Sequence, residues 1–163
     1  MTITVFTDLR CPSCGTYQLD EIDPLVEEYA RTGKARLELR HFSLGPEETT
    51  LAAEAATAAG EQGRQWQYAD LLFRNIDAAG AEVDDEFLRE VAEAVPELDV
   101  DQWSEDRESP QVAARVASDA QTATDLRLPG TGPAVVVTGP GGERELDDSP
   151  PREEIEQAVA QVS

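Results

Sequence analysis

The chain has 163 residues, 40% of them hydrophobic, and a formal net charge of −21 from 34 acidic and 13 basic side chains. This length suits one domain with a substantial core, so we expect a single domain over residues 1–163. The negative charge argues against nucleic acid or an anionic membrane as a partner, and no apolar run approaches the ~20 residues of a membrane-spanning helix.

The N-terminal residues predict a short strand followed by a helix that opens with both cysteines. Residues 3–7 are rich in β-branched and aromatic side chains, which favour a strand. Met1 leads into this strand without a basic segment or a cleavage site. We therefore expect a cytoplasmic protein, or an extracytoplasmic one if a leader or anchor has been trimmed. Pro12 suits the first helical position, where its missing N–H costs nothing.

The motif Cys11-Pro12-Ser13-Cys14 predicts a thiol–disulfide redox centre. The spacing places both sulfurs on the first helical turn, where unpaired N–H groups and the helix dipole favour a thiolate. Cys11 is nearer the N-terminus and expected to be more exposed, so it is the predicted nucleophile. Cys14 would resolve the mixed disulfide. The cysteine pair is itself the redox group, so no cofactor is expected.

Other uses of two cysteines fit the sequence less well. A zinc site needs about four ligands, and the chain offers two cysteines and His41, so no metal site is expected. A haem attachment needs histidine where Gly15 stands, and an iron–sulfur cluster would lack thiolates. A purely structural disulfide stays open, although closing so short a loop removes little entropy from the unfolded chain.

The helix that begins at Pro12 is predicted to end at Gly33, and a strand at residues 35–41 follows. Pro24 interrupts the apolar stripe of this helix. We expect either a kink there or a new helix with Asp23 as its N-cap.

Residues 46–127 are predicted to be helical throughout. One helix begins after Asp84, which caps it, and another begins after Pro110. This block is too long for a loop and too embedded for a separate domain, so we expect a helical insertion in an α/β core.

The C-terminal part predicts two strands and a helix. Residues 134–137 form a β-branched run suited to a strand buried on both faces, and residues 143–146 are its predicted antiparallel partner. Ser149 is predicted to cap the last helix, with Pro150 at its first position.

The resulting order, β-α-β, helices, β-β-α, with Cys-Pro-x-Cys after the first strand, resembles the DsbA-like members of the thioredoxin fold, above all the minimal type called thioredoxin_4. The motifs that carry the resemblance run through nearly the whole chain: Phe6-x-Asp8-x-x-Cys11-Pro12-x-Cys14, Arg40-His41-Phe42-Ser43-Leu44, Ala52-Ala53-x-Ala55-Ala56, Glu61-Gln62-Gly63, Tyr68-x-x-Leu71-Leu72-Phe73 and Gly130-Thr131-Gly132-Pro133. The resemblance implies an α/β thioredoxin fold with a central mixed sheet.

The resemblance also implies a cis-proline loop opposite the cysteines, and Pro133 is the matching position. Its flanking residues Thr131 and Gly132 would help to hold a substrate peptide. The family usually has Gly-Thr-Pro here, and Gly132 before Pro133 departs from that pattern. Because Gly132 has no side chain, the sequence predicts neither the geometry of this loop nor its effect on the redox potential of the cysteine pair.

Four residues near the cysteines are expected to modulate their chemistry: Asp8, Arg10, Pro12 and Ser13. Val5 stands where thioredoxin and DsbA carry a buried carboxylate. Asp8, if partly buried, could accept a proton from Cys14, and Arg10 would stabilise a thiolate or point into water. Ser13 could donate a hydrogen bond to the Cys11 sulfur. His41 is expected to have a structural or surface role rather than a catalytic one.

These observations predict a thiol–disulfide oxidoreductase that acts on cysteine-containing proteins or peptides and is recycled by a redox partner. A monomer is expected. Oxidase, reductase and isomerase directions stay open. The alternatives are a redox-sensing or chaperone-like binding module and a glutathione-linked transferase or isomerase of the DsbA fold. The latter typically has serine at the nucleophile position, whereas Cys11 and Cys14 are both present here.

Overall fold

The computed structural model describes residues 1–42, 47–79, 83–128 and 132–163. Its elements follow the order β1 (Thr2–Thr7), α1 (Pro12–Tyr17), η1 (Gln18–Ile22), α2 (Asp23–Leu25), η2 (Val26–Ala30), β2 (Arg36–His41), α3 (Glu47–Glu61), α4 (Gln65–Ala79), α5 (Asp85–Ala94), α6 (Val100–Arg107), α7 (Pro110–Asp125), β3 (Ala134–Gly139), β4 (Gly142–Leu146) and α8 (Arg152–Val162). This order confirms the predicted α/β class and the β-α-β, helices, β-β-α sequence.

The four strands form one mixed sheet in the order β2-β1-β3-β4. Strand β1 pairs in parallel with β2 and antiparallel with β3, and β3 pairs antiparallel with β4. Val135 and Val137 contribute to one apolar core, and Ala134 and Val136 to the other. This confirms the prediction that residues 134–137 are buried on both faces.

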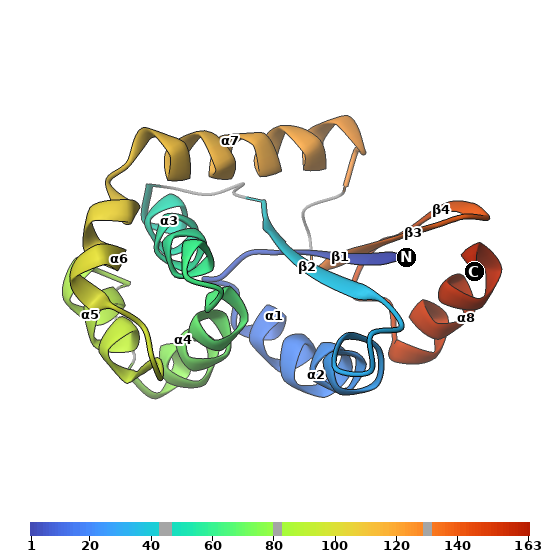
Figure 1. The fold of residues 1–163 in the computed structure, drawn as a ribbon, viewed down its shortest axis with the longest axis horizontal. Helices are drawn as coiled ribbons and strands as arrows, with labels where there is room; N and C mark the ends of the chain where they lie inside the picture. The colour runs from blue at the N-terminus through green and yellow to red at the C-terminus, as the bar shows by residue number, and fades with distance from the viewer. Residues whose placement is uncertain (43–46, 80–82, 129–131) are drawn as a thin grey trace.

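Helices cover both faces of this sheet. Figure 1 shows α7 along one face and α1, α2 and α8 along the other, with α3 to α6 gathered at one end. Ala123 of α7 packs on Phe6 and Val136, whereas Ile155 and Val159 of α8 join the larger core that contains Ile3 and Val5. Alternate side chains of β1 and of β3 therefore enter different cores, as strand geometry requires.

Of the two alternatives predicted at Pro24, the structure rules out the new helix capped by Asp23. Asp23 has helical angles, φ −56° and ψ −41°, so it is not the N-cap of a new helix. The chain instead widens into a π-helical turn at Gln18–Ile22, and the N–H of Asp23 bonds to the carbonyl of Gln18. Because a π turn shifts the bonding register by one residue, it accommodates a proline that has no N–H to donate.

The predicted helical block is confirmed by α3 to α7. Asp84 caps α5, since its side chain accepts the N–H of Phe87, as the sequence indicated. Two buried bonds to backbone carbonyls hold the block together: Tyr68 donates to Leu88 and Trp103 donates to Ala55, both at 2.8 Å. In the described part of the chain no helix is both long and apolar enough to span a membrane.

The start of the last helix was predicted too early. Helix α8 begins at Arg152 and Pro151 precedes it as the N-cap residue. Ser149 is not a cap, because it has a positive φ of 60° and its N–H donates to the carbonyl of Pro133. The apolar face of the helix is as predicted, with Ile155, Val159 and Val162 buried.

His41 lies at the end of β2 and is 2% exposed. Its Nε2 lies 3.1 Å from Nε2 of Gln65, and its backbone N–H donates to Asp119 of α7. Burial, with the positive charge of Arg115, lowers the pKa of His41 to about 4. This histidine is therefore a neutral packing residue that connects β2 to α4 and α7, as expected from its position.

The burial of His41 makes stability depend on pH. Between its ordinary pKa of 6.5 and about 4, the unfolded chain binds a proton that the folded chain excludes. Stability is therefore retained above pH 6.5 and lost as the pH falls toward 4, by about 3 kcal/mol at most. As the pH falls from 6.5 to about 4, we expect the free energy of unfolding of the wild type to decrease by this amount relative to that of His41→Gln. Denaturant titrations of both proteins across this pH range give the measurement.

Asp119 titrates in both proteins, so its own contribution cancels in the difference. A stability difference that does not change across this pH range would contradict the prediction.

Candidate redox site

Cys11 and Cys14 form a disulfide at the junction of β1 and α1, with Cα atoms 5.1 Å apart. Strand β1 ends at Thr7, and a tight turn follows in which the N–H of Cys11 donates to the carbonyl of Asp8. Cys11 is the N-cap residue of α1, and Pro12 occupies its first turn. The strand-then-helix placement of the motif is therefore as predicted.

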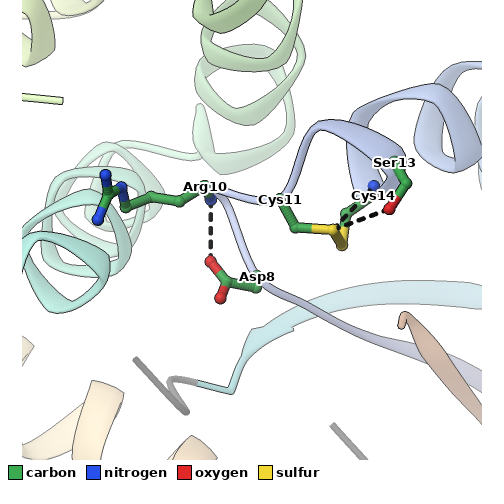
Figure 2. Close-up of a disulfide and its surroundings, with 5 residues drawn as sticks. All are labelled: Asp8, Arg10, Cys11, Ser13 and Cys14. Carbon is green, nitrogen blue, oxygen red and sulfur yellow. Dashed lines mark hydrogen bonds between the residues drawn. A yellow bond between two sulfur atoms is a disulfide. The ribbon is translucent and has the colours of Figure 1, made fainter. Parts of the chain in front are cut away.

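Two hydrogen bonds converge on the sulfur of Cys11 (Figure 2). The N–H of Cys14 donates to it at 3.2 Å, and the hydroxyl of Ser13 lies 3.2 Å from it. A disulfide sulfur carries no hydrogen, so Ser13 is the donor. Both donors would stabilise negative charge on this sulfur when the disulfide is reduced.

The two cysteines differ in access. Cys11 is partly exposed, whereas Cys14 is 2% exposed and belongs to the larger apolar core. Thiol–disulfide exchange requires an approach to the sulfur that is attacked. The geometry therefore leaves Cys11 as the sulfur that an external thiol or disulfide can reach.

Two charged residues, Asp8 and Arg10, come just before the disulfide in the chain. Asp8 is half-buried, and its Oδ1 accepts the backbone N–H of Arg10 at 2.9 Å. Burial raises the pKa of Asp8, against the lowering effects of this bond and of the Arg10 charge. The side chain of Arg10 points away from the Cys11 sulfur (Figure 2).

Cys14 belongs to the larger apolar core. Val5, at the position where the family resemblance implies an acid, is a fully buried member of the same core. Gly15, directly after Cys14, faces α4, and a Cβ built on it would lie 3.0 Å from Cδ1 of Phe73. A larger residue there would push α4 away from the helix that carries the disulfide. The sequence gives the glycine, but it does not show that Phe73 packs against it.

The expected proline loop is only partly described. Thr131 lies outside the described residues. Gly132 and Pro133 are buried, and among the described residues no peptide bond is cis, so Pro133 follows a trans bond. The cis-proline expectation is therefore wrong for this structure. A trans bond is the intrinsic preference of X–Pro, and here the Pro133 carbonyl is held by the N–H of Ser149 at 2.8 Å.

Sequence reasoning missed a second connection to the disulfide helix. The hydroxyl of Tyr17 donates to the carbonyl of Pro150 at 2.7 Å across 133 residues. Burial, with the charges of Glu21 and Glu154, raises the pKa of Tyr17, so the hydroxyl stays protonated and can donate. A tyrosine on an apolar helix face is an ambiguous signal, because its packing does not reveal a partner for its hydroxyl.

Comparison with known proteins agrees with this geometry. The family profile Thioredoxin_4, described as thioredoxin, matches residues 1–160. The "Probable disulfide bond formation protein D" of Bacillus cereus is 30% identical over 141 residues, which are 84% of this chain and 65% of that protein. The chain thus spans about two thirds of the length of this relative.

Solved structures match over almost all of this chain. A thioredoxin-like oxidoreductase from Silicibacter pomeroyi is 26% identical, with a TM-score of 0.78, covering 98% of this chain and 84% of that one. Oxidised BdbD from Bacillus subtilis is 18% identical, with a TM-score of 0.81, covering 98% of this chain and 85% of that one. At 18% identity, the similarity to BdbD shows a shared fold and nothing more.

Replacing Ser13 by alanine should make the disulfide less oxidising. The variant loses one hydrogen bond to the Cys11 sulfur, so the reduced form is less stabilised. Because the bond is exposed, we expect its loss to lower the equilibrium constant for reduction of the disulfide by glutathione about twofold to fivefold. The measurement is titration with a glutathione redox series, with Ser13→Thr as the control that keeps a hydroxyl. Equal constants for the alanine variant and wild type would contradict the role of Ser13.

Proposed function

Because the chain belongs to the thioredoxin family represented by this profile, we propose that it is a thiol–disulfide oxidoreductase that exchanges disulfides with cysteine-containing proteins or peptides. The observation that carries the proposal is the disulfide itself, with one accessible sulfur at a helix N-terminus and one buried sulfur behind it. The relative from Bacillus cereus, named for disulfide bond formation, supports the same chemistry.

In the oxidising direction a substrate thiolate attacks the sulfur of Cys11. The bond between Cys11 and Cys14 breaks, and Cys14 leaves as a thiolate that takes up a proton. A second substrate thiolate then attacks the substrate sulfur of the mixed disulfide and releases Cys11. Two electrons have passed from the substrate dithiol to the cysteine pair.

The reverse sequence reduces a substrate disulfide: the Cys11 thiolate attacks, and Cys14 resolves the mixed disulfide. In either direction a second thiol–disulfide couple must return the pair to its starting state, and we propose a redox partner of that class. The N–H of Cys14 and the hydroxyl of Ser13 stabilise Cys11 when it is the thiolate.

The proton on Cys14 needs an acceptor or donor near the motif. We propose Asp8 for this part, because it is half-buried and burial raises its pKa, which brings its proton affinity closer to that of a thiol. We also propose that the loop of Gly132 and Pro133 lies along the bound substrate. The Pro133 carbonyl already accepts the N–H of Ser149, so a peptide would pair with other backbone groups of this loop.

The Cys11–Cys14 couple should be reversible, with a reduction potential between about −270 mV, typical of thioredoxin, and about −120 mV, typical of DsbA. The test is equilibration of the wild-type protein with glutathione mixtures, followed by alkylation of the free thiols. A value near the upper limit assigns an oxidase, and one near the lower limit assigns a reductase. If no reversible couple forms, the disulfide is structural and the proposal fails.

Substituting each cysteine separately tests their roles. The Cys14→Ser variant should accumulate a mixed disulfide between Cys11 and a cysteine peptide, because no internal thiol remains to release it. The Cys11→Ser variant should form no such adduct, because Cys14 is 2% exposed. Mass spectrometry of the two variants after reaction with an activated peptide disulfide gives the result.

Equal adduct formation by both variants would overturn the assignment of Cys11 as the nucleophile. If the wild-type protein binds peptides tightly in one redox state but turns over slowly, a redox-sensing binding module replaces the enzyme.

A further inference from the structure

Three long-range hydrogen bonds converge on the segment that joins β4 to α8. The N–H of Ser149 donates to the carbonyl of Pro133 at 2.8 Å. The hydroxyl of Tyr17 donates to the carbonyl of Pro150 at 2.7 Å, and the N–H of Arg152 donates to the carboxylate of Glu21 at 2.7 Å. Residues 149–152 therefore join the helix that carries the disulfide to the loop of Pro133.

The backbone of this segment is held in an unfavourable conformation. Asp148 and Ser149 are consecutive residues with φ values of 59° and 60°. Neither is glycine, and the left-handed region is costly for residues with a Cβ. Such a conformation persists only where its surroundings impose it, and it is often found at functional sites. The bonds of Ser149 and Pro150 are the surroundings that impose it here.

Asp148 and Ser149 also occupy the space beside Gly132. A Cβ built on Gly132 would lie 2.8 Å from Oγ of Ser149 and 3.5 Å from Oδ1 of Asp148. Gly132 and Pro133 are buried, whereas Asp148 and Ser149 are exposed. A peptide that approaches the loop from this side therefore meets Asp148 and Ser149, which lie where a side chain on residue 132 would otherwise be.

We propose that Tyr17 is a positioning residue for disulfide exchange with peptides: through Pro150 and Ser149 it holds the loop of Pro133 against the helix of Cys14, and Asp148 and Ser149 form the surface that a peptide contacts there. This inference rests on the proposed function, since it assigns the part of the molecule that aligns the peptide with Cys11. It adds no chemical step, because the sulfurs that react are those of Cys11 and Cys14.

The proposal separates two kinds of substrate. Under this proposal a cysteine peptide aligns its backbone with the loop as its sulfur approaches Cys11. A small thiol such as dithiothreitol or glutathione reaches the same sulfur without a backbone strand to align. A loosened loop should therefore slow exchange with the peptide and leave exchange with the small thiol nearly unchanged.

The test compares Tyr17→Phe with Tyr68→Phe in the full chain. Both tyrosines are buried, and each donates to a backbone carbonyl, at 2.7 Å in one case and 2.8 Å in the other. Each substitution thus removes one buried bond of the same kind and keeps the ring. The bond of Tyr68 lies within the helical block, whereas that of Tyr17 reaches the segment beside Pro133.

For each protein we would measure the second-order rate constant for oxidation of an extended peptide that contains two cysteines, and that for oxidation of dithiothreitol. Tyr17→Phe should lower the peptide rate about threefold to tenfold, the equivalent of one buried hydrogen bond, and change the dithiothreitol rate less than about twofold. Tyr68→Phe should leave both rates within about twofold of wild type.

Two results would overturn the inference. If Tyr17→Phe lowers both rates equally, Tyr17 acts on the cysteines themselves rather than on the loop. If it changes neither rate, or only as much as Tyr68→Phe does, its bond is merely structural. Failure of the proposed function would be visible separately, because the wild-type protein would then exchange disulfides with the peptide in neither the oxidising nor the reducing direction.

Discussion

Strand β1 is buried on both faces, and this constraint positions the chemistry of the molecule. It pairs with β2 on one side and β3 on the other, so it cannot slip without exposing the side chains that it places in both cores. The strand ends at Thr7, and one tight turn brings Cys11 to the start of α1. The disulfide therefore stands on the most constrained part of the sheet, with its inner sulfur in the core and its outer sulfur accessible.

The environment of the disulfide is built mainly from neutral hydrogen-bond donors. Val5 is a fully buried member of the apolar core that contains Cys14, the side chain of Arg10 points away from the Cys11 sulfur, and Ser13 and the N–H of Cys14 bond to that sulfur. Both donors would stabilise a thiolate on Cys11 when the disulfide is reduced.

Local patterns in the sequence predicted the helices and strands well, and the segments that connect or begin them less well. The strands at residues 35–41 and 134–137, the cap at Asp84 and the apolar face of the last helix are all as expected. The differences lie at prolines. Near Pro24 the chain forms a π turn rather than a new helix capped by Asp23, and the bond before Pro133 is trans where the family resemblance implied cis. The isomer of an X–Pro bond and the register of a helix are chosen by contacts from other segments, which a single stretch of sequence does not contain.

The sequence by itself determined the α/β class and the placement of the cysteine pair between a strand and a helix, and it led to the proposed order of nucleophile and resolving cysteine, because each follows from residue types at short spacing. Only the tertiary structure decided what surrounds the pair. The contacts of Tyr17 with Pro150 and of Ser149 with Pro133 join residues that are distant in sequence, and the left-handed angles of Asp148 and Ser149 occur in the segment that these contacts hold. Hydrogen bonds between segments depend on how the sheet and its helices pack together, and that packing is a property of the whole chain.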